Sequence, residues 1–480
     1  MSATKTLTSI VDPSKTYVID AEAKGEGGKK IVFFSPKRDF AVGIYKSDPD
    51  QVFMDRLKDL VGRYRRDLFE HEGGDVWMTR FCWPYDIIRT GKGKIGIVMP
   101  LYPPHFLFEK GNLKGKEKKG NWFTKPLSRR GVDLTEVGDW RGMLLCALDL
   151  ARTIRRLHAA GLCHSDLSYN NVLLSPTNGK VQVIDVDELV VPGKYPAGVL
   201  GTNWFIAPEV VIDHSIEPSQ RTDLHALACL IYLYLLRRHP LQGRKVFDQD
   251  PDSDDRIQQG KGALFVEDSR DSSNRPEVEG YRPLDWSNVE RLPYQAVTGP
   301  YLSKLIKQAF EEGIHDPSRR PSASEWENAL WNTYERLTPC SNPKCTEHFF
   351  VLNKAKTCPF CLQPLSYTVP IFDIHCKRKD EWTFVRRQVY GTHGKSMHKW
   401  HFFDNIFFNE KTPKADIATV GSVVAHKGGW YFHNSKLNDL VIVMNGKETP
   451  LSIGGTIKLE EGMEIRNDAD HGVMLKVKFK

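Results

Sequence analysis

The sequence has no apolar run long enough to cross a bilayer, which takes about 20 residues in a helix. The longest apolar stretch, residues 226–236, is much shorter and is followed by Arg237 and Arg238, so it predicts a buried helix. Residues 1–14 contain no apolar core, and no signal peptide is predicted there. We therefore expect a cytoplasmic protein.

The chain also has little excess of one charge, with a net charge of +7 over 480 residues. Several basic residues lie between 110 and 130, but a solvated loop explains them better than a nucleic-acid patch, so nucleic acid is not an expected partner. The hydrophobic fraction of 40% and the charged fraction of 26% are ordinary for a globular protein. This length predicts two or three domains.

Short apolar runs predict strands over 17–20, 30–34, 40–45, 95–99, 172–174 and 181–184. Apolar residues at helical spacing predict helices over about 48–64 and 140–160, and Gly161 ends the second. Residues 248–276 are rich in Asp, Ser and Gly and predict an irregular loop. A strand-rich segment thus precedes a helical one.

Residues with the chemistry of phosphoryl transfer follow the second helix. Residues 164–171 have the sequence His-Ser-Asp-Leu-Ser-Tyr-Asn-Asn, and residues 184–187 have the sequence Ile-Asp-Val-Asp. The carboxylate of Asp166 can accept a hydroxyl proton, and Asn171 and Asp185 offer oxygen ligands for a metal ion. Each motif alone is weak evidence.

Further motifs follow in order at 201–209 (Gly-Thr-Asn-Trp-Phe-Ile-Ala-Pro-Glu), 221–227 and 316–321 (Asp-Pro-Ser-Arg-Arg-Pro). Together they resemble the motifs of eukaryotic-like Ser/Thr protein kinases. The resemblance implies an α+β two-lobe kinase fold over 13–335, with an N-lobe over 13–100 and a C-lobe over 101–335.

The same resemblance implies ATP and Mg²⁺ (or Mn²⁺) as cofactors and protein substrates. Asp166 would be the catalytic base, Asn171 and Asp185 would hold Mg²⁺, and Glu209 would pair with Arg320. Thr202 favours Ser and Thr as acceptors over Tyr. Ser165 stands where the family has an arginine that receives an activation-loop phosphate, which argues against that switch.

The predicted N-lobe departs from the kinase pattern. Gly25, Gly27 and Gly28 lie where a phosphate-covering loop belongs but do not complete G-x-G-x-x-G, and a plain hairpin is an equal alternative. Gly43 occupies the position of the phosphate-binding lysine, and Asp187 replaces the glycine two residues after Asp185. These departures leave a second hypothesis open, a pseudokinase scaffold that recruits partners.

A lysine from the neighbouring strand could replace the missing one. Side chains alternate between the faces of a strand, so Lys29 and Lys30 are predicted to point oppositely, and Lys30 is the one expected to face the nucleotide. Lys46 is expected on the far face of its own strand. The helix carboxylate that accompanies this lysine in the family would be Asp55 or Asp59.

Residues 99–102 match the family's adenine-binding segment. Met99 would be the gatekeeper. Pro100 has no N–H, so its carbonyl and the N–H of Tyr102 are the expected contacts to adenine.

Four of the nine cysteines are clustered, namely Cys340, Cys345, Cys358 and Cys361. Two Cys pairs joined by a short loop have the spacing of a zinc ribbon, which we place at 336–370 with a structural Zn²⁺. The other five cysteines are expected to be reduced thiols.

Residues 371–480 alternate short β runs with turns. Residues 429–465 resemble the second half of a forkhead-associated (FHA) domain, a β-sandwich that binds phosphothreonine. Ser435 and Asn438 match part of its pocket, but its first-half motifs are missing, and a structural or docking β-sandwich is the alternative. The combination of kinase, zinc ribbon and FHA-like domain resembles bacterial kinases of tellurite-resistance and stress systems. That resemblance implies a metal-dependent protein phosphatase and a von Willebrand A-type protein as partners.

Overall fold

The computed structural model describes residues 3–71, 73–124, 131–276, 292–379 and 381–480. Contacts divide the chain into two compact units: one takes in residues up to Asn328 apart from a short part of a helix at 295–302, and the other takes in that part and residues 329–480. Within the described residues, no helix has the length and apolarity that a membrane span requires.

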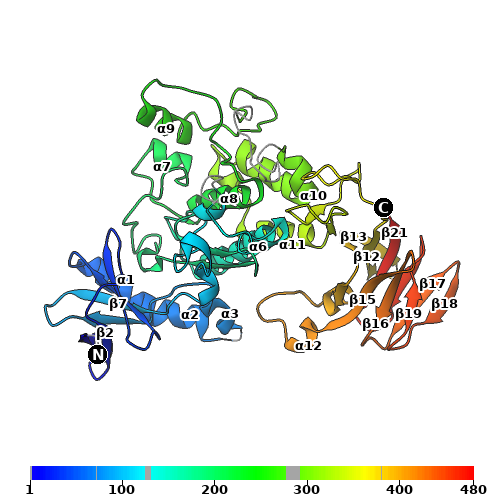
Figure 1. Ribbon diagram of the computed structural model, residues 1–480, viewed down its shortest axis with the longest axis horizontal. Coiled ribbons are helices and arrows are strands. Elements are labelled where there is room, and N and C mark those ends of the chain that lie inside the picture. Colours follow the sequence, from blue (N-terminus) through cyan, green and yellow to red (C-terminus); the bar gives the residue numbers. More distant parts are fainter. Residues whose placement is uncertain (1–2, 72, 125–130, 277–291, 380) are drawn as a thin grey trace. The chain divides into compact units, whose positions relative to one another are not determined.

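The first unit begins with a seven-stranded sheet in the order β2-β1-β6-β7-β5-β4-β3. Figure 1 labels β2 and β7 of this sheet, in the part of the chain that holds the N-terminus. Its strands are β1 (Thr4–Ser9), β2 (Thr16–Asp20), β3 (Gly25–Glu26), β4 (Lys30–Phe34), β5 (Ala41–Tyr45), β6 (Asp86–Arg89) and β7 (Ile95–Met99). Helix α1 (Gln51–Asp59) continues through a π-helical turn (Leu60–Tyr64) into α2 (Arg65–Phe69), and α3 (Gly74–Met78) follows. The sequence did not predict β1 or β6, and β1 lies ahead of the predicted domain start.

Helices dominate residues 140–334, most of which belong to the first unit. The long elements are α6 (Trp140–Ala159), α8 (Gln220–Leu236) and α11 (Ala323–Tyr334), with α7 (Pro208–Ile212), α9 (Pro251–Gln259) and α10 (Tyr294–Lys307) between them. Short turns are α4 (Asn121–Thr124) and the 3₁₀ segments Pro104–Phe106, Gly111–Leu113, Val186–Glu188 and Pro317–Arg319, with a π turn at Gln308–Glu312. In the hairpin of β8 (Val172–Ser175) and β9 (Lys180–Val183), Asn171 comes just before β8 and Asp185 comes two residues after β9.

The helix predicted over 140–160 is confirmed by α6, which ends just before Gly161 at a φ of 77°. The loop predicted over 248–276 is wrong in part, because α9 forms inside it. The Asp250 side chain accepts a hydrogen bond from the Ser253 backbone N–H at 2.8 Å, and Pro251 occupies the first helical turn. Both are helix-start features, and here they override the composition.

The second unit holds the cysteine cluster and two larger sheets. One sheet has the order β13-β12-β21-β20-β17-β18 and the other β14-β15-β16-β19, while β10 (Leu337–Pro339) and β11 (Phe349–Val351) form a separate hairpin. The remaining strands are β12 (Pro370–Arg378), β13 (Glu381–Tyr390), β14 (Lys395–His398), β15 (Thr419–His426), β16 (Gly429–Asn434), β17 (Leu440–Met444), β18 (Lys447–Pro450), β19 (Thr456–Lys458), β20 (Glu464–Asn467) and β21 (Val473–Phe479). A 3₁₀ turn (Lys399–His401) and α12 (Lys414–Ile417) lie between β14 and β15.

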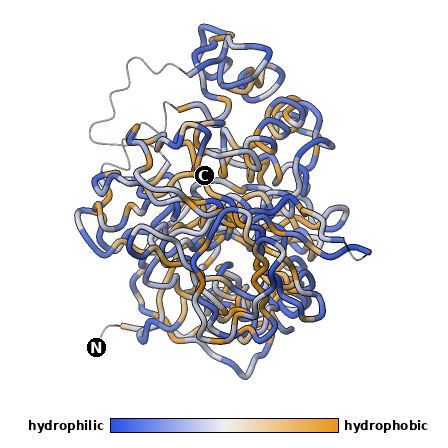
Figure 2. Tube along the Cα trace, turned by 90° about the vertical axis from the view of Figure 1, so that its right-hand side faces the viewer, coloured by the Kyte–Doolittle hydropathy of each residue, from blue (hydrophilic) through white to orange (hydrophobic). Residues whose placement is uncertain are grey.

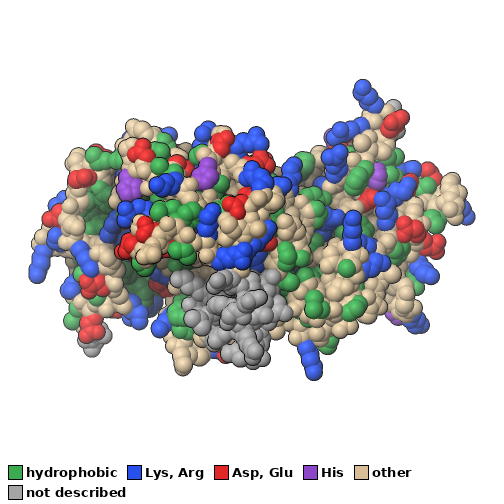
Figure 3. Space-filling view, turned by 90° about the horizontal axis from the view of Figure 1, so that it is seen from above, with side chains coloured by type: hydrophobic (Ala, Val, Ile, Leu, Met, Phe, Trp, Pro, Cys, Tyr) green, Lys and Arg blue, Asp and Glu red, His purple; other side chains and the backbone are tan. Residues whose placement is uncertain are grey.

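The two larger sheets share one apolar core, to which Phe372 and Leu475 contribute from the first sheet and Val423 and Phe432 from the second. Figure 2 shows apolar residues concentrated along the packed helices and strands and hydrophilic residues in many peripheral loops. On the face seen in Figure 3, basic and acidic side chains are interspersed, as the modest net charge suggests.

Candidate functional site

Asp166 lies in the loop between α6 and β8, and both of its carboxylate oxygens accept hydrogen bonds. Asn171 Nδ2 donates to Asp166 Oδ2 at 2.8 Å and to the Asp166 carbonyl at 2.8 Å. Thr202 Oγ1 donates to Asp166 Oδ1 at 2.6 Å. The predicted base is therefore fixed by a residue of its own loop and by a residue of the 201–209 motif.

Asp223 on α8 fixes the backbone of the same loop through hydrogen bonds. Its buried carboxylate accepts hydrogen bonds from the backbone N–H groups of His164, at 2.7 Å, and Ser165, at 3.1 Å. His158 Nε2 lies 3.0 Å from the same carboxylate. Ser165 has a φ of 61°, a conformation that costs energy for a non-glycine residue, and the two bonds to Asp223 offset that cost.

Asp185 follows β9 and also has a left-handed backbone, with φ 55° and ψ 43°. The preceding residue, Ile184, donates its N–H to the Asn171 carbonyl at 3.0 Å and accepts from His164 Nε2 at 2.9 Å. The hairpin thus brings the backbones of the two predicted metal ligands side by side. The Asp185 side chain is 58% exposed, so it remains accessible to a ligand.

Lys30 lies against this loop. Its Nζ is 2.6 Å from Asp187 Oδ1 and 3.3 Å from Asp185 Oδ1, and its side chain is 15% exposed. Burial by itself would lower the pKa of Lys30, but Asp187 and then Asp185 raise it above its usual value. Lys30 is therefore a permanent cation beside the predicted metal ligand.

Gly43 makes room for that lysine. A Cβ atom at Gly43 would lie 3.3 Å from Lys30 Cδ and 2.9 Å from Met99 Cε. Lys30 on β4 and Gly43 on β5 belong to paired strands, with Val32 opposite Gly43 and Lys30 opposite Tyr45. The position that carries lysine in the family is thus crossed by the side chain of Lys30. Lys46 Nζ instead lies 2.7 Å from Glu26 Oε1.

Two expectations about the surroundings of Lys30 are wrong, namely the direction of Lys29 and the carboxylate that pairs with Lys30. Lys29 does not point to the opposite face: it precedes β4, and its Nζ lies 2.6 Å from Glu188 Oε2 on the same loop. Asp59 binds Lys194 Nζ at 2.5 Å and the Tyr195 hydroxyl at 2.7 Å. Asp55 pairs with Lys58 at 3.4 Å. Neither helix carboxylate is the partner of Lys30 in the described structure.

The predicted adenine-binding segment borders an apolar cluster. Met99 and Tyr102 pack against the buried side chains of Cys82, Phe106, Leu173 and Ile184. The Pro100 carbonyl lies 3.6 Å from Cys82 Sγ. This arrangement can offer an apolar surface to a flat ring.

The predicted glycine loop is a hairpin turn between β3 and β4. The Gly27 N–H donates to the Lys30 carbonyl at 2.9 Å. A Cβ atom at Gly25 or Gly28 would meet no other atom within 4 Å. Packing within the chain therefore does not require glycine at 25 or 28, while the Gly27 N–H is already used within the turn.

The predicted pair of Glu209 and Arg320 is confirmed. Arg320 Nη1 and Nη2 donate to the two Glu209 oxygens at 2.8 and 2.7 Å, and the Arg320 side chain is 1% exposed. Such a bidentate buried pair fixes the end of the 201–209 segment to the 316–321 motif.

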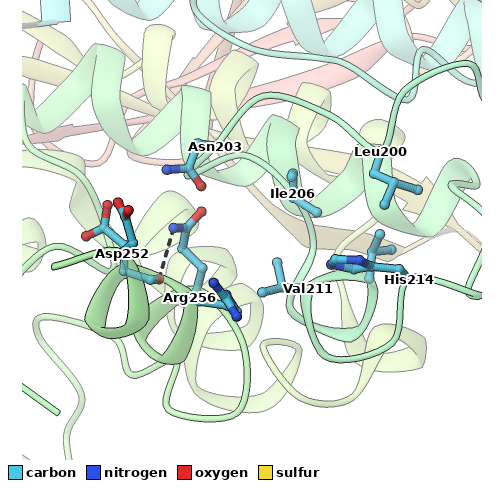
Figure 4. Close-up of a pocket in the computed structure, with 10 residues that line it drawn as sticks. Leu200, Asn203, Ile206, Val211, His214, Asp252 and Arg256 are labelled. Carbon is cyan, nitrogen blue, oxygen red and sulfur yellow. Dashed lines mark hydrogen bonds between the residues drawn. The ribbon is translucent and has the colours of Figure 1, made fainter. Parts of the chain in front are cut away.

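A cavity of about 200 Å³ lies beside this segment (Figure 4). Leu200 and Asn203, which flank the Thr202 region, line it together with Ile206 and with residues of α7 and α9. The α7 and α9 residues are Val210, Val211, Asp252, Asp255, Arg256 and Gln259, and His214 follows α7. Sequence reasoning missed this cavity because it is completed by α9.

The four clustered cysteines meet in the second unit. Their sulfur atoms all lie within 4.8 Å of one another, with Cys340 and Cys361 at 3.5 Å and Cys345 and Cys358 at 3.9 Å. Four thiolates around a zinc ion with Zn–S bonds of 2.3 Å would be separated by about 3.8 Å. The residues therefore fit a tetrahedral Zn²⁺ site.

The predicted FHA pocket residues lie at a turn after β16. The Ser435 N–H donates to the Val420 carbonyl at 2.9 Å, and Asn438 is exposed. Asn434, which sequence reasoning did not single out, is buried and donates to the Leu437 and Leu451 carbonyls at 2.7 and 2.9 Å. It therefore holds this turn together from inside.

Comparisons with known proteins agree with the geometry of the first unit. Residues 138–332 match the family model of the protein kinase domain. The serine/threonine-protein kinase PknA of Mycobacterium tuberculosis is 33% identical over 107 residues, which is 20% of this chain and 24% of that protein. The serine/threonine-protein kinase oca2 of Schizosaccharomyces pombe is 31% identical over 284 residues, which is 56% of this chain and 37% of that protein.

The chain thus spans 24% and 37% of the length of these two relatives. Among solved structures, ROP2 from Toxoplasma gondii, described as having a protein-kinase fold and no enzymatic activity, covers 69% of this chain and 84% of its own. Its TM-score is 0.41 and its sequence identity 14%. That likeness is too weak to bear on activity.

Proposed function

We propose that this chain transfers the γ-phosphate of ATP to Ser or Thr hydroxyls of protein substrates. The match of residues 138–332 to the protein kinase domain model and the similarity to two serine/threonine-protein kinases support the proposal. The observation that carries the proposal is the position of Lys30. Its buried ammonium group reaches Asp185 from the neighbouring strand, so the absence of a lysine at Gly43 does not remove the cation from the site.

Asp166 is the proposed catalytic base. Its carboxylate is oriented by Asn171 and Thr202, and orientation of this kind places the base toward the acceptor hydroxyl. Asn171 and Asp185 would hold Mg²⁺, which when bound neutralises charge on the phosphate oxygens. Lys30 would then stabilise the α- and β-phosphates.

The remaining predicted site residues would hold the rest of the nucleotide. Met99 and Tyr102 supply the apolar surface for adenine, and the Pro100 carbonyl and the Tyr102 N–H supply polar contacts. The backbone of Gly25, Gly27 and Gly28 would approach the phosphates, where the lack of a Cβ atom permits close contact. The open surroundings of Gly25 and Gly28 support this role.

We infer that the substrate protein contacts the cavity shown in Figure 4. Thr202 lies within the segment that lines this cavity and donates to Asp166, so a chain that presents its hydroxyl to Asp166 passes close by. Replacing Val211 by Asp in the apolar wall should raise the KM for the protein substrate and leave the KM for ATP unchanged. Equal changes in both constants would argue against this contact.

The second unit has proposed roles in structure and recruitment. The four cysteines would hold a structural Zn²⁺, and the two sheets would form an FHA-like β-sandwich next to the zinc ribbon. The division into a kinase domain, a zinc ribbon and a sandwich stays a prediction, since contacts join the last two in one unit. A cytoplasmic bacterial stress-signalling role, with a metal-dependent phosphatase and a von Willebrand A-type partner, rests only on the resemblance stated above.

A pseudokinase scaffold is the second candidate. One observation favours it: Lys30 lies closer to Asp187, at 2.6 Å, than to Asp185, at 3.3 Å, and a tight pair of this kind could keep the lysine from the nucleotide. A scaffold would still recruit partners through the second unit but would transfer no phosphate.

The experiment that separates the two is a transfer assay on the full chain. The protein is incubated with γ-labelled ATP, Mg²⁺ or Mn²⁺ and a mixture of acceptor proteins, beside Asp166→Ala. A kinase labels Ser or Thr only when Asp166 is present. A scaffold gives the same low background for both proteins.

A further inference from the structure

Lys30 requires something to hold it in place. A lysine side chain rotates about each bond of its four-carbon stem, and fixing it costs about 2 kcal/mol of conformational entropy. It also extends from β4 rather than from β5, so it approaches the loop at 185–187 over Gly43. A precise position therefore depends on its partners.

Asp187 is the closest of those partners. Its side chain is 3% exposed, Lys30 Nζ contacts its Oδ1 at 2.6 Å, and the Tyr45 hydroxyl donates to its Oδ2 at 2.6 Å. Burial alone would raise the pKa of Asp187, but Lys30 and Tyr45 lower it below its usual value. A buried carboxylate is stable only with such partners, so the three residues form one satisfied unit.

Helix α1 is occupied elsewhere. Arg56, rather than an acidic residue, is buried on this helix, and its guanidinium donates to the carbonyls of Glu188 and Pro196. Asp59 is bound by Lys194 and Tyr195. Arg56 and Asp59 therefore contact the segment after Asp187, Asp55 pairs with Lys58 on the helix itself, and Lys30 is paired by the loop at 185–187 instead.

We propose that Asp187, braced by Tyr45, is the positioning residue for Lys30 and takes the place of a carboxylate from α1. This inference rests on the proposed function of the site. Asp187 lies two residues after Asp185, on the 3₁₀ turn Val186–Glu188. A single turn thus orients both the metal-binding aspartate and the phosphate-binding lysine, and the position of Lys30 does not depend on movement of α1.

Nucleotide binding tests this without requiring transfer. The affinity of the full chain for a fluorescent ATP analogue with Mg²⁺ is measured for wild type, Asp187→Asn, Lys30→Met and the double variant. Asp187→Asn removes the charge and keeps the shape, and we expect at least tenfold weaker binding. In the Lys30→Met background the same change should cost less than twofold, because there is no lysine left to position.

Tyr45→Phe is the milder second variant, since it removes one hydrogen bond and keeps the aromatic ring. It should weaken binding in the same direction, by a smaller factor. Asp55→Asn is the matched control, because Asp55 is an exposed carboxylate on α1 that pairs with Lys58, and it should bind as wild type does. Urea unfolding of each variant checks that the fold is retained.

Three results would overturn the proposal. Full affinity in Asp187→Asn would show that Lys30 needs no such partner. Equal losses in the presence and absence of Lys30 would assign Asp187 a separate role, either structural or as a metal ligand; a changed Mg²⁺ dependence would identify the latter. A loss in Asp55→Asn would return the role to α1. Failure of the kinase proposal is seen separately, as absence of Asp166-dependent transfer by wild type, and the binding series still decides the role of Asp187.

Discussion

Replacing Lys30 by Met and, separately, Lys29 by Met compares two neighbouring lysines that contact the same loop. Lys30 is 15% exposed and contacts Asp185 and Asp187. Lys29 is 53% exposed and pairs with Glu188. The two variants remove the same charge from the chain, so a difference between them reports the place of the charge in the site.

The magnitude follows from burial. A positioned donor that stabilises transition-state charge in a water-poor site contributes about 2.7–4 kcal/mol, so Lys30→Met should lower kcat/KM by about 10²–10³-fold. An exposed pair such as that of Lys29 contributes about 0.2–1 kcal/mol. Lys29→Met should therefore change kcat/KM by less than about fivefold.

Lys30→Met also leaves Asp187 buried without its cation, which costs about 3–5 kcal/mol of stability when one partner of a buried pair is removed. The double variant Lys30→Met/Asp187→Asn removes that orphan charge. Initial rates of transfer from γ-labelled ATP are measured for each variant, with the folded fraction determined by urea unfolding. If the folded Lys30→Met variant transfers phosphate as fast as wild type, the relocated lysine is wrong.

Three further results are expected. Asp185→Ala should abolish transfer with little change in the midpoint of urea unfolding, since that carboxylate is largely exposed; retained transfer would remove it from the metal site. Cys358→Ser, or chelation, should release zinc, as measured by elemental analysis, and should unfold residues 338–370 while the kinase lobes stay folded. The reason is that structural zinc contributes folding free energy on the order of 10 kcal/mol. A zinc-free wild type with disulfide-bonded cysteines would refute this. Glu335 is buried with His401 Nε2 at 3.0 Å and Lys395 Nζ at 3.2 Å, so Glu335→Gln should lower the unfolding free energy of the second unit by about 3–5 kcal/mol. Burial would raise the pKa of Glu335, but Lys395 and His401 lower it well below its usual 4.5. The stability that the ionised Glu335 contributes is therefore fully present above pH 4.5 and is lost as the pH falls through the lowered pKa. A difference in unfolding free energy between wild type and Glu335→Gln that grows in acid would contradict this.

Much of the loop at 164–171 could be predicted from the sequence because its contacts are local. Asp166 and Asn171 are five residues apart and contact each other directly. The pair of Glu209 and Arg320 is 111 residues apart, yet it was predicted because two separate motifs of one family name its members. The helix over 140–160 was predicted from its apolar spacing.

The partners of Lys30 could not be predicted in the same way. Lys30 and Asp187 are separated by 157 residues, and Asp187 departs from the family motif, so no pattern pointed to the contact. The alternation of side chains along a strand failed for Lys29 because that residue lies just outside β4. Helix α9 was missed because composition outweighed the local signal of Asp250 and Pro251.

The most direct test of the central claim compares the position of the label in ATP. The full chain is incubated with acceptor proteins and either γ-labelled or α-labelled ATP, with Asp166→Ala in parallel, and the labelled amino acids are identified. We expect protein-bound label from the γ-phosphate alone, on Ser or Thr, and none in Asp166→Ala. Label from the α-phosphate, or no label that depends on Asp166, would contradict it.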